Sequence, residues 1–341
     1  MPQSKDWPFH KLLCHWYTSR KDQSKTFSKV SCLKAVPELL QLLSKLLCLL
    51  KQKQISLKDS DFYTLKSNRE LSANTALESQ LAQLLIENRD FITYLKSHFH
   101  FTAEDLLQIL FRLACNAVGI SNQDLQYVAV GLYLQASLVN HSCHPNAIFL
   151  FEGNVLILKA LKNIFSGEEI VVAYIDVMQD KHTRQKELQE RYLFVCECEK
   201  CRDGSTGAEA EHRCPCCLSL VYDQSGIANH SCKGELKQIV EKENLCFYFS
   251  CIKACCDKLP FLKDRSEQLK LIEKLIHFYL EISSDLNVHV AAYLNRAMDL
   301  CIELQLYRKA ITYGERALPA MEVHYSELHP LYALQALPSL C

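Results

Sequence analysis

The sequence predicts an α+β protein in which a group of short β-strands lies between helical regions. Between Gly119 and Tyr174, short β-branched runs alternate with turns marked by glycine and proline, which is typical of small strands joined tightly. Before and after this stretch, apolar residues recur close to the helical period. Because 341 residues exceed what one hydrophobic core usually organises, we expect two or three modules.

The composition argues against two kinds of binding. The 38 Lys and Arg residues nearly balance the 39 Asp and Glu residues, so the chain lacks the excess positive charge that direct nucleic-acid binding requires. The longest apolar run, residues 39–50, is shorter than a bilayer span and contains Gln41, Ser44 and Lys45. It therefore predicts a buried or amphipathic helix, and no membrane segment.

The first candidate metal ligands are His10 and Cys14. Their His-x3-Cys spacing is one helical turn, which can aim both side chains at one tetrahedral metal ion. Two ligands do not complete a zinc site, so the alternative of a surface histidine beside a free cysteine stays open.

Three helices are expected next, at residues 37–54, 75–98 and 103–115. Pro37 lies near the start of the first, and Thr102 followed by two acidic residues is an N-cap signature for the third. Their leucines recur at helical spacing, which packing alone requires, so we assign them to the core.

The most specific stretch is Asn-His-Ser-Cys-His-Pro-Asn at residues 140–146. Strand-like runs follow at residues 147–151, 155–161 and 170–174, with a Gly-Glu-Glu turn before the last of them. A charged helix is predicted for residues 181–192. Beyond residue 235 the chain is expected to be helical, and small residues in the segments 286–304 and 307–320 predict two closely packed helices that resemble a tetratricopeptide (TPR) unit.

Two further cysteine groups lie between these helical parts. Cys196, Cys198 and Cys201 are too close in sequence for sensible disulfides among themselves but suit one zinc ion. After a small linker at residues 203–207, Cys214 and Cys217 have the spacing of a zinc knuckle, which His230 or Cys232 could complete. No second knuckle of matching form follows, so free cysteines remain the alternative there.

The motif at residues 140–146, the strands after it and the run from Arg191 to Cys201 together resemble the SET and MYND domain (SMYD) family of protein-lysine methyltransferases. The resemblance implies a SET-type fold of short strands with a helical insert, a zinc-bound post-SET loop and a C-terminal TPR-like region. The implied domains are a MYND remnant (1–20), the helical insert (21–115), the SET core (116–195), the post-SET and additional cysteine cluster (196–233) and an incomplete TPR-like domain (234–341).

The resemblance also implies residue roles. Tyr174 and Tyr192 match the tyrosines that wall the lysine channel and orient the amine, although either tyrosine could instead be an ordinary half-buried one. The positions that match family contacts to S-adenosylmethionine are Asn68, Asn116, Asn140, His141, Tyr174 and Phe194. Cys143 matches the fourth zinc ligand beside Cys196, Cys198 and Cys201.

The same resemblance predicts departures from a complete family member. The cysteines and the glycine-containing cofactor loop that precede the His-x3-Cys pair in the family are absent before Trp7, and the family has more helices after the last residue. We therefore expect a chain truncated at both ends that binds the cofactor weakly. A second hypothesis is a catalytically silent, zinc-stabilised interaction module, and calorimetry with S-adenosylmethionine discriminates the two.

As partners, the resemblance implies a protein substrate, either a histone tail or another lysine-containing protein. Further protein partners would bind the C-terminal helices. It also implies a monomer located in the cytoplasm and the nucleus.

Overall fold

The α+β class predicted from the sequence is confirmed. A computed structural model of the chain describes residues 2–19, 36–71, 75–202, 212–213, 220–222, 242–281, 286–325 and 328–340. The chain forms two compact units. Unit 1 comprises Met1–Asn140, Phe149–Lys159 and Lys186–Val195, and unit 2 comprises His141–Ile148, Ala160–Gln185 and Cys196–Cys341.

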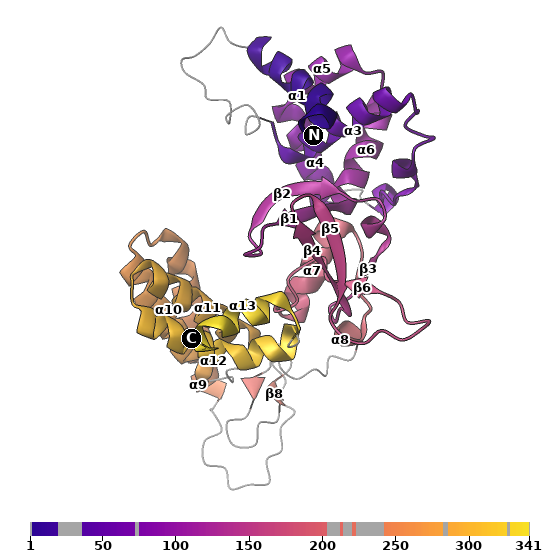
Figure 1. The fold of residues 1–341 in the computed structure, drawn as a ribbon. Helices are drawn as coiled ribbons and strands as arrows, with labels where there is room; N and C mark the ends of the chain where they lie inside the picture. The colour runs from indigo at the N-terminus through magenta and orange to yellow at the C-terminus, as the bar shows by residue number, and fades with distance from the viewer. Residues whose placement is uncertain are drawn as a thin grey trace. The chain divides into compact units, whose positions relative to one another are not determined.

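Unit 1 contains a helical layer and small strands (Figure 1). Its helices are α1 (Pro2–Ser19), α3 (Glu38–Lys53), α4 (Ala76–Glu87), α5 (Arg89–His98) and α6 (Ala103–Asn116). Leucines from all five helices meet in one core with Trp16 and Phe91. The helical spacing of leucine in the sequence therefore marks core packing, as predicted.

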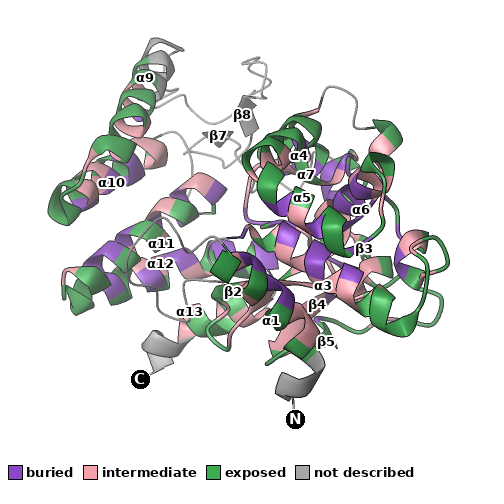
Figure 2. Cartoon of the chain, turned by 90° about the horizontal axis from the view of Figure 1, so that it is seen from above, coloured by how far each residue is buried: buried purple, intermediate pink, exposed green. Residues whose placement is uncertain are grey.

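Local signals explain where α3 and α6 begin. Pro37, whose φ of −53° suits a helix start, is the N-cap of α3, and Gln54 ends that helix in the left-handed conformation. Thr102 caps α6 in a capping box with Asp105, since each side chain bonds the backbone N–H of the other. Both helices carry buried residues (Figure 2): those of α3 recur at helical spacing on one side, whereas those of α6 include the five consecutive residues 109–113.

The expectation of one helix over residues 75–98 is wrong. The structure has two helices, α4 and α5, which are separated at Asn88. There the backbone leaves helical geometry at φ −113° and ψ 26°, and the Asn88 side chain donates a hydrogen bond of 2.8 Å to Leu84 O. An asparagine that bonds the preceding turn competes with helix continuation.

The strands are short and paired two by two. β1 (Ala117–Ser121) pairs antiparallel with β2 (Tyr127–Leu132). β4 (Ala147–Glu152) pairs with β5 (Val155–Ala160), and β3 (Asn140–His141) pairs with β6 (Val171–Val172). A fourth pair joins β7 (His212–Arg213) to β8 (Leu220–Tyr222). The predicted strand at residues 170–174 is thus reduced to two residues.

Unit 2 has its own helical core. Its helices are α8 (Glu199–Arg202), α9 (Lys242–Lys258), α10 (Arg265–Leu280), α11 (Val288–Glu303), α12 (Tyr307–Tyr325) and α13 (Pro330–Leu340). The predicted pair of close helices corresponds to α11 and α12, where Ala297 and Ala317 are fully buried. At Gly314 an added Cβ would lie 3.1 Å from the Met298 sulfur, so glycine permits this approach.

One helix, α7 (Lys181–Tyr192), has the bounds that the sequence predicts. Among the described helices, none combines the length and apolar character that a bilayer crossing needs. The linker at residues 203–207 and the candidate ligands Cys214, Cys217 and Cys232 lie outside the described residues. The five domain boundaries stay a prediction.

A candidate metal centre of four cysteines

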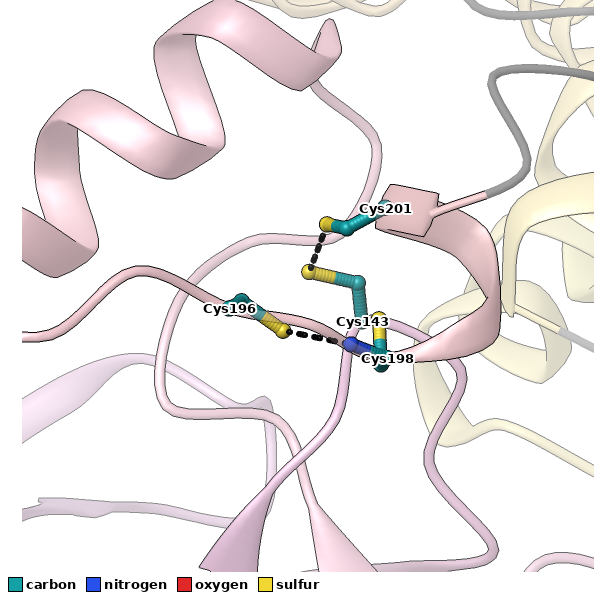
Figure 3. Close-up of side chains that lie close together, drawn as sticks. All are labelled: Cys143, Cys196, Cys198 and Cys201. Atoms are coloured by element: carbon teal, nitrogen blue, oxygen red, sulfur yellow. Dashed lines mark hydrogen bonds between the residues drawn. The ribbon is translucent and has the colours of Figure 1, made fainter.

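Four cysteine side chains from two distant segments of unit 2 converge on one point. Cys143 follows β3, Cys196 and Cys198 lie in the loop after α7, and Cys201 lies in α8. Their sulfur atoms all lie within 4.8 Å of one another. Figure 3 shows the side chains directed toward a common centre. The sulfur atoms of Cys143 and Cys201 lie 3.6 Å apart.

Backbone bonds fix the loop that carries three of these cysteines. The side-chain amide of Gln185 bonds Cys196 twice: its nitrogen donates to Cys196 O at 2.7 Å, and its oxygen accepts from Cys196 N at 2.9 Å. Cys198 O accepts from the N–H groups of Cys201 and Arg202, both at 2.9 Å, which starts α8. The loop is therefore held in shape by α7 on one side and by α8 on the other.

The cluster fits a tetrahedral metal ion. With metal–sulfur bonds of about 2.3 Å, neighbouring sulfurs in a tetrahedral zinc site lie about 3.8 Å apart, close to the 3.6 Å between the Cys143 and Cys201 sulfurs. Hydrogen bonds among the four thiols lower the pKa of Cys198 and Cys201 and raise the pKa of Cys143 and Cys196. Proton loss is therefore easiest at Cys198 and Cys201, and a bound metal ion would favour it at all four thiols.

Buried positive charge beside the cluster completes this fit. Four thiolates around a divalent ion carry a net charge of −2, which is costly in the interior without compensation. Arg184 of α7 is fully buried and its guanidinium lies 3.8 Å from the Cys201 sulfur. Lys200 is also buried, and its ammonium donates to Val177 O at 3.0 Å and lies 3.3 Å from His324 Nδ1.

The residues on both sides of Cys143 are connected to β6 through backbone and side-chain bonds. Ser142 N donates to Val172 O at 3.0 Å. The Asn146 side chain, only 2% exposed, accepts from Val171 N at 2.9 Å and donates to Glu169 O at 2.8 Å. The Pro-Asn turn of the motif thus fixes the short strand that leads to Tyr174.

Tyr174 itself contacts the motif through His141. The Tyr174 backbone N–H donates to His141 Nδ1 at 3.0 Å, and the two rings lie 5.3 Å apart. The other ring nitrogen of His141, Nε2, lies 3.3 Å from the Cys143 sulfur. One candidate catalytic residue is therefore built directly onto the candidate metal centre.

Several predicted cofactor residues lie in unit 1. The Asn68 side chain donates to Tyr192 O at 2.9 Å, and the Asn116 side chain donates to Lys66 O and Arg112 O, both at 2.8 Å. Tyr192 and Phe194 are half-buried, and burial raises the pKa of Tyr192. Asn140, at the start of β3, is exposed.

Two predicted groupings of side chains, the lysine channel and the cofactor cavity, are not tested by these contacts. Tyr174 belongs to unit 2 and Tyr192 to unit 1, so the proposed channel between their hydroxyls stays a prediction. The same holds for a shared cavity of Asn116, Asn140, His141 and Phe194.

His10 and Cys14 near the N-terminus lie close together but offer only two metal ligands. His10 Nε2 lies 3.2 Å from the Cys14 sulfur within α1, as the helical spacing predicts. Within the described residues, the four-cysteine cluster is the only group of three or more candidate ligands.

Sequence reasoning missed the buried cations. Arg184 was expected on a charged helix, where solvent exposure is the usual state, and Lys200 stood among charged residues of the loop. Only their position between cysteines and a distant helix makes them part of the site. Lys200 directly precedes Cys201 and Arg184 lies before the cysteine segment, but neither position in the sequence indicates that the side chain is buried.

Comparison with known proteins agrees with the motifs. The SET domain family model matches residues 10–175. The chain is 27% identical to the histone-lysine N-methyltransferase SMYD3 of Homo sapiens, with 98% of this chain and 70% of that protein covered. It is 26% identical to the N-lysine methyltransferase SMYD2 of Homo sapiens, over 78% of this chain and 59% of that protein. It is also 26% identical to the histone-lysine N-methyltransferase ASHR1 of Arabidopsis thaliana, with 69% of this chain and 52% of that protein covered.

Proposed function

Because the chain belongs to the SMYD family of SET-domain methyltransferases, we propose that it transfers a methyl group from S-adenosylmethionine to a lysine of a protein substrate. The observation that carries the proposal is the contact of His141 with both Tyr174 and Cys143. It joins the Asn-His-Ser-Cys motif, a candidate catalytic tyrosine and the cysteine cluster within a few ångströms. Relatives named for histone-lysine and N-lysine methylation support a protein lysine as the acceptor.

The second part of the proposal is that Cys143, Cys196, Cys198 and Cys201 hold one zinc ion. The donor set supports it, since four thiolates at tetrahedral spacing are typical of structural zinc. Such a site has no open coordination position, so the ion would stabilise the loop after α7 and take no part in bond making. Arg184 and Lys200 would offset its net negative charge.

When bound, S-adenosylmethionine supplies a methyl group on a positively charged sulfur. Two side chains of unit 1 suit its amino end: in the described part of the chain, neither Asn68 nor Asn116 uses its Oδ1 atom as a hydrogen-bond acceptor. These oxygens can accept from an ammonium group. Phe194 offers a half-buried ring for the adenine.

The remaining task of the chain is to align a neutral lysine amine with the methyl group. Such a displacement needs orientation and exclusion of water more than acid–base chemistry. We assign this task to Tyr174 and Tyr192, since a tyrosine ring can wall a lysine passage and its hydroxyl can orient the amine. Proteins that carry lysine-rich tails, histones among them, are the proposed substrates, in the nucleus and the cytoplasm.

The direct test is incubation of the purified chain with S-adenosylmethionine carrying a labelled methyl group and with core histones as acceptor. Transfer of label to histone lysines, mapped by mass spectrometry, is the expected result. The variant Tyr174→Phe should lower it, whereas Tyr133→Phe, which removes a hydroxyl bonded to Asn154 O, should not.

A parallel calorimetric titration with S-adenosylmethionine separates this function from the alternative. A chain that binds neither cofactor nor acceptor but retains its zinc would be the silent interaction module. Zinc content measured on wild-type protein and on Cys198→Ser tests the metal separately from methyl transfer.

A further inference from the structure

The His141 side chain touches both the cysteine cluster and the backbone of Tyr174. It ends β3, and β3 pairs with β6, which precedes Tyr174 by two residues. Its Nδ1 atom lies 3.0 Å from Tyr174 N, and its Nε2 atom lies 3.3 Å from the Cys143 sulfur. Both nitrogens of one ring are therefore engaged by protein groups.

The chemistry of these two partners determines where the ring proton lies. A backbone N–H can only donate, so Nδ1 must present a lone pair to Tyr174. A neutral imidazole has one N–H, which must then be on Nε2. Nε2 points at the Cys143 sulfur, which is fully buried, so the N–H donates to sulfur.

We infer that His141 is a positioning residue, fixed as the Nε2–H tautomer, that links the Cys143 thiolate of the metal centre to the backbone of Tyr174. This inference rests on the proposed zinc occupancy, but it does not depend on methyl transfer. It gives the histidine of the motif a structural task through its side chain, separate from any contact with cofactor. The tautomer and orientation of such a ring are set by the partner of its other nitrogen.

Two of the other three cysteines also receive N–H donors. Arg184 directs a guanidinium N–H at the Cys201 sulfur from 3.8 Å, and Cys198 N lies 3.5 Å from the Cys196 sulfur. Hydrogen bonds to a charged acceptor are stronger than those to a neutral one. If Cys143 were a thiolate ligand of a metal ion, the bond that it accepts from His141 would be stronger than with a thiol. The hydrogen bond from the Tyr174 amide to the same ring would then change as well.

The sequence offers an unusually direct probe of Tyr174. Only Tyr174 and Tyr293 follow an alanine, so protein labelled with ¹³C at alanine carbonyls and ¹⁵N at tyrosine gives two amide signals in a carbonyl-correlated spectrum. Tyr293 lies in α11 and serves as an internal control. We expect His141→Ala to shift the Tyr174 amide proton upfield, since its acceptor is lost, and to leave the Tyr293 signal in place.

Matched variants separate this role from general damage to the loop. His141→Gln keeps one donor and one acceptor, so the Tyr174 signal should move part of the way back toward wild type. His144→Ala changes a neighbouring exposed histidine and should leave both signals unchanged. With cadmium-113 in place of zinc, His141→Ala should also shift the metal resonance, because one thiolate loses its N–H donor.

The tautomer is read from the wild-type protein, and His141→Ala serves to assign the signal. In ¹⁵N-histidine protein, the imidazole spectrum should contain a neutral ring with its proton on Nε2, and this signal should be missing from His141→Ala. A proton on Nδ1 of His141 would overturn the inference. So would a Tyr174 amide that does not respond to His141→Ala while the cadmium resonance stays sharp.

Discussion

Tyr174 and Tyr192 carry the sharpest prediction for single residues. Replacing either with Phe keeps the ring and removes the hydroxyl that we propose orients the amine. If that hydrogen bond forms mainly in the transition state, kcat should fall by about 10²-fold. The affinity for S-adenosylmethionine should change much less. Steady-state kinetics and calorimetry on the same preparations measure both quantities.

The matched control for these variants is Tyr133→Phe. Tyr133 also donates through its hydroxyl, to Asn154 O at 2.9 Å, but it has no proposed part in the reaction. An unchanged methylation rate in Tyr192→Phe would remove that residue from the proposed channel. A similar fall in all three variants would point to a general loss of structure.

His324 of α12 predicts how stability depends on pH. Burial, reinforced by the positive charge of Lys200, lowers the pKa of His324 to about 4, whereas an unfolded chain protonates histidine at about 6.5. Because the pKa of His324 is lower in the folded state, the neutral imidazole gives its full contribution to the free energy of unfolding above about pH 6.5. This contribution is lost as the pH falls toward 4, because the unfolded state binds the proton first.

The test compares urea unfolding of wild type and His324→Gln between pH 7 and pH 4.5. The glutamine keeps an acceptor for Lys200 but does not titrate, so its stability should fall less over this range, by on the order of 2 kcal/mol. His277→Gln, at an exposed site on α10, is the control. Parallel pH profiles for wild type and His324→Gln would contradict the prediction.

Which residues build the site was only partly visible in the sequence. The spacing of Cys196, Cys198 and Cys201 indicated a shared metal, because cysteines so close in sequence must also lie close together in space. Cys143 came from a resemblance, since nothing local connects it to a loop more than fifty residues later. Arg184 and Lys200 could not be found at all, because burial of a cation depends on partners that are distant in the chain.

Elements were predicted best where the signal is local. The capping residues of α6 and the full extent of α7 follow from side chains within one or two turns. The break at Asn88 was missed because apolar periodicity continues across it, and a single side chain bonded to Leu84 O decides the geometry. The strand before Tyr174 ends at Val172, and the backbone N–H of Tyr174 bonds the His141 side chain and not a neighbouring strand.

The capping box of α6 gives a prediction at the scale of one element. Thr102→Ala removes the acceptor of the Asp105 N–H and the donor to its carboxylate. The expected loss in free energy of unfolding is about 1 kcal/mol. Urea unfolding followed by circular dichroism measures it. Thr93→Ala, at an exposed position inside α5, is the control and should be neutral or slightly stabilising, because alanine favours helix.

At the scale of the whole molecule, the chain does not complete one compact unit before it enters the other. The structure divides it into two units, and the chain passes between them several times, first at Asn140 and again at Phe149. A reading of the sequence assigns neighbours to the same module, but strands and loops here join residues that are far apart. The predicted α+β class depends only on the types of the elements, so it is correct whichever unit each element belongs to.

The two units contain separate natural probes, which allows a prediction for each. Both tryptophans lie in unit 1, and Trp16 is buried against Phe91 with ring centroids 4.8 Å apart. Three of the four methionines, Met178, Met298 and Met321, lie in unit 2, as does the cysteine cluster. Tryptophan fluorescence therefore reports on unit 1, and ¹³C-methyl methionine spectra report on unit 2.

We expect loss of zinc to weaken unit 2 selectively. Bound structural metal contributes several kcal/mol to folding, and each kcal/mol shifts the melting temperature of a domain of this size by about 2–4 °C. In Cys198→Ser carrying Trp7→Phe, the signals of Met178 and Met321, which pack together in one cluster, should therefore collapse at least about 10 °C earlier than in Trp7→Phe alone. The melting temperature reported by Trp16 should not change.

Cys251→Ser is the control, because Cys251 is a half-buried cysteine of unit 2 outside the cluster, and it should change neither melting temperature. If both probes shifted together in Cys198→Ser, the metal centre would stabilise the molecule as one cooperative body, and the division of stability between the units would have to be given up.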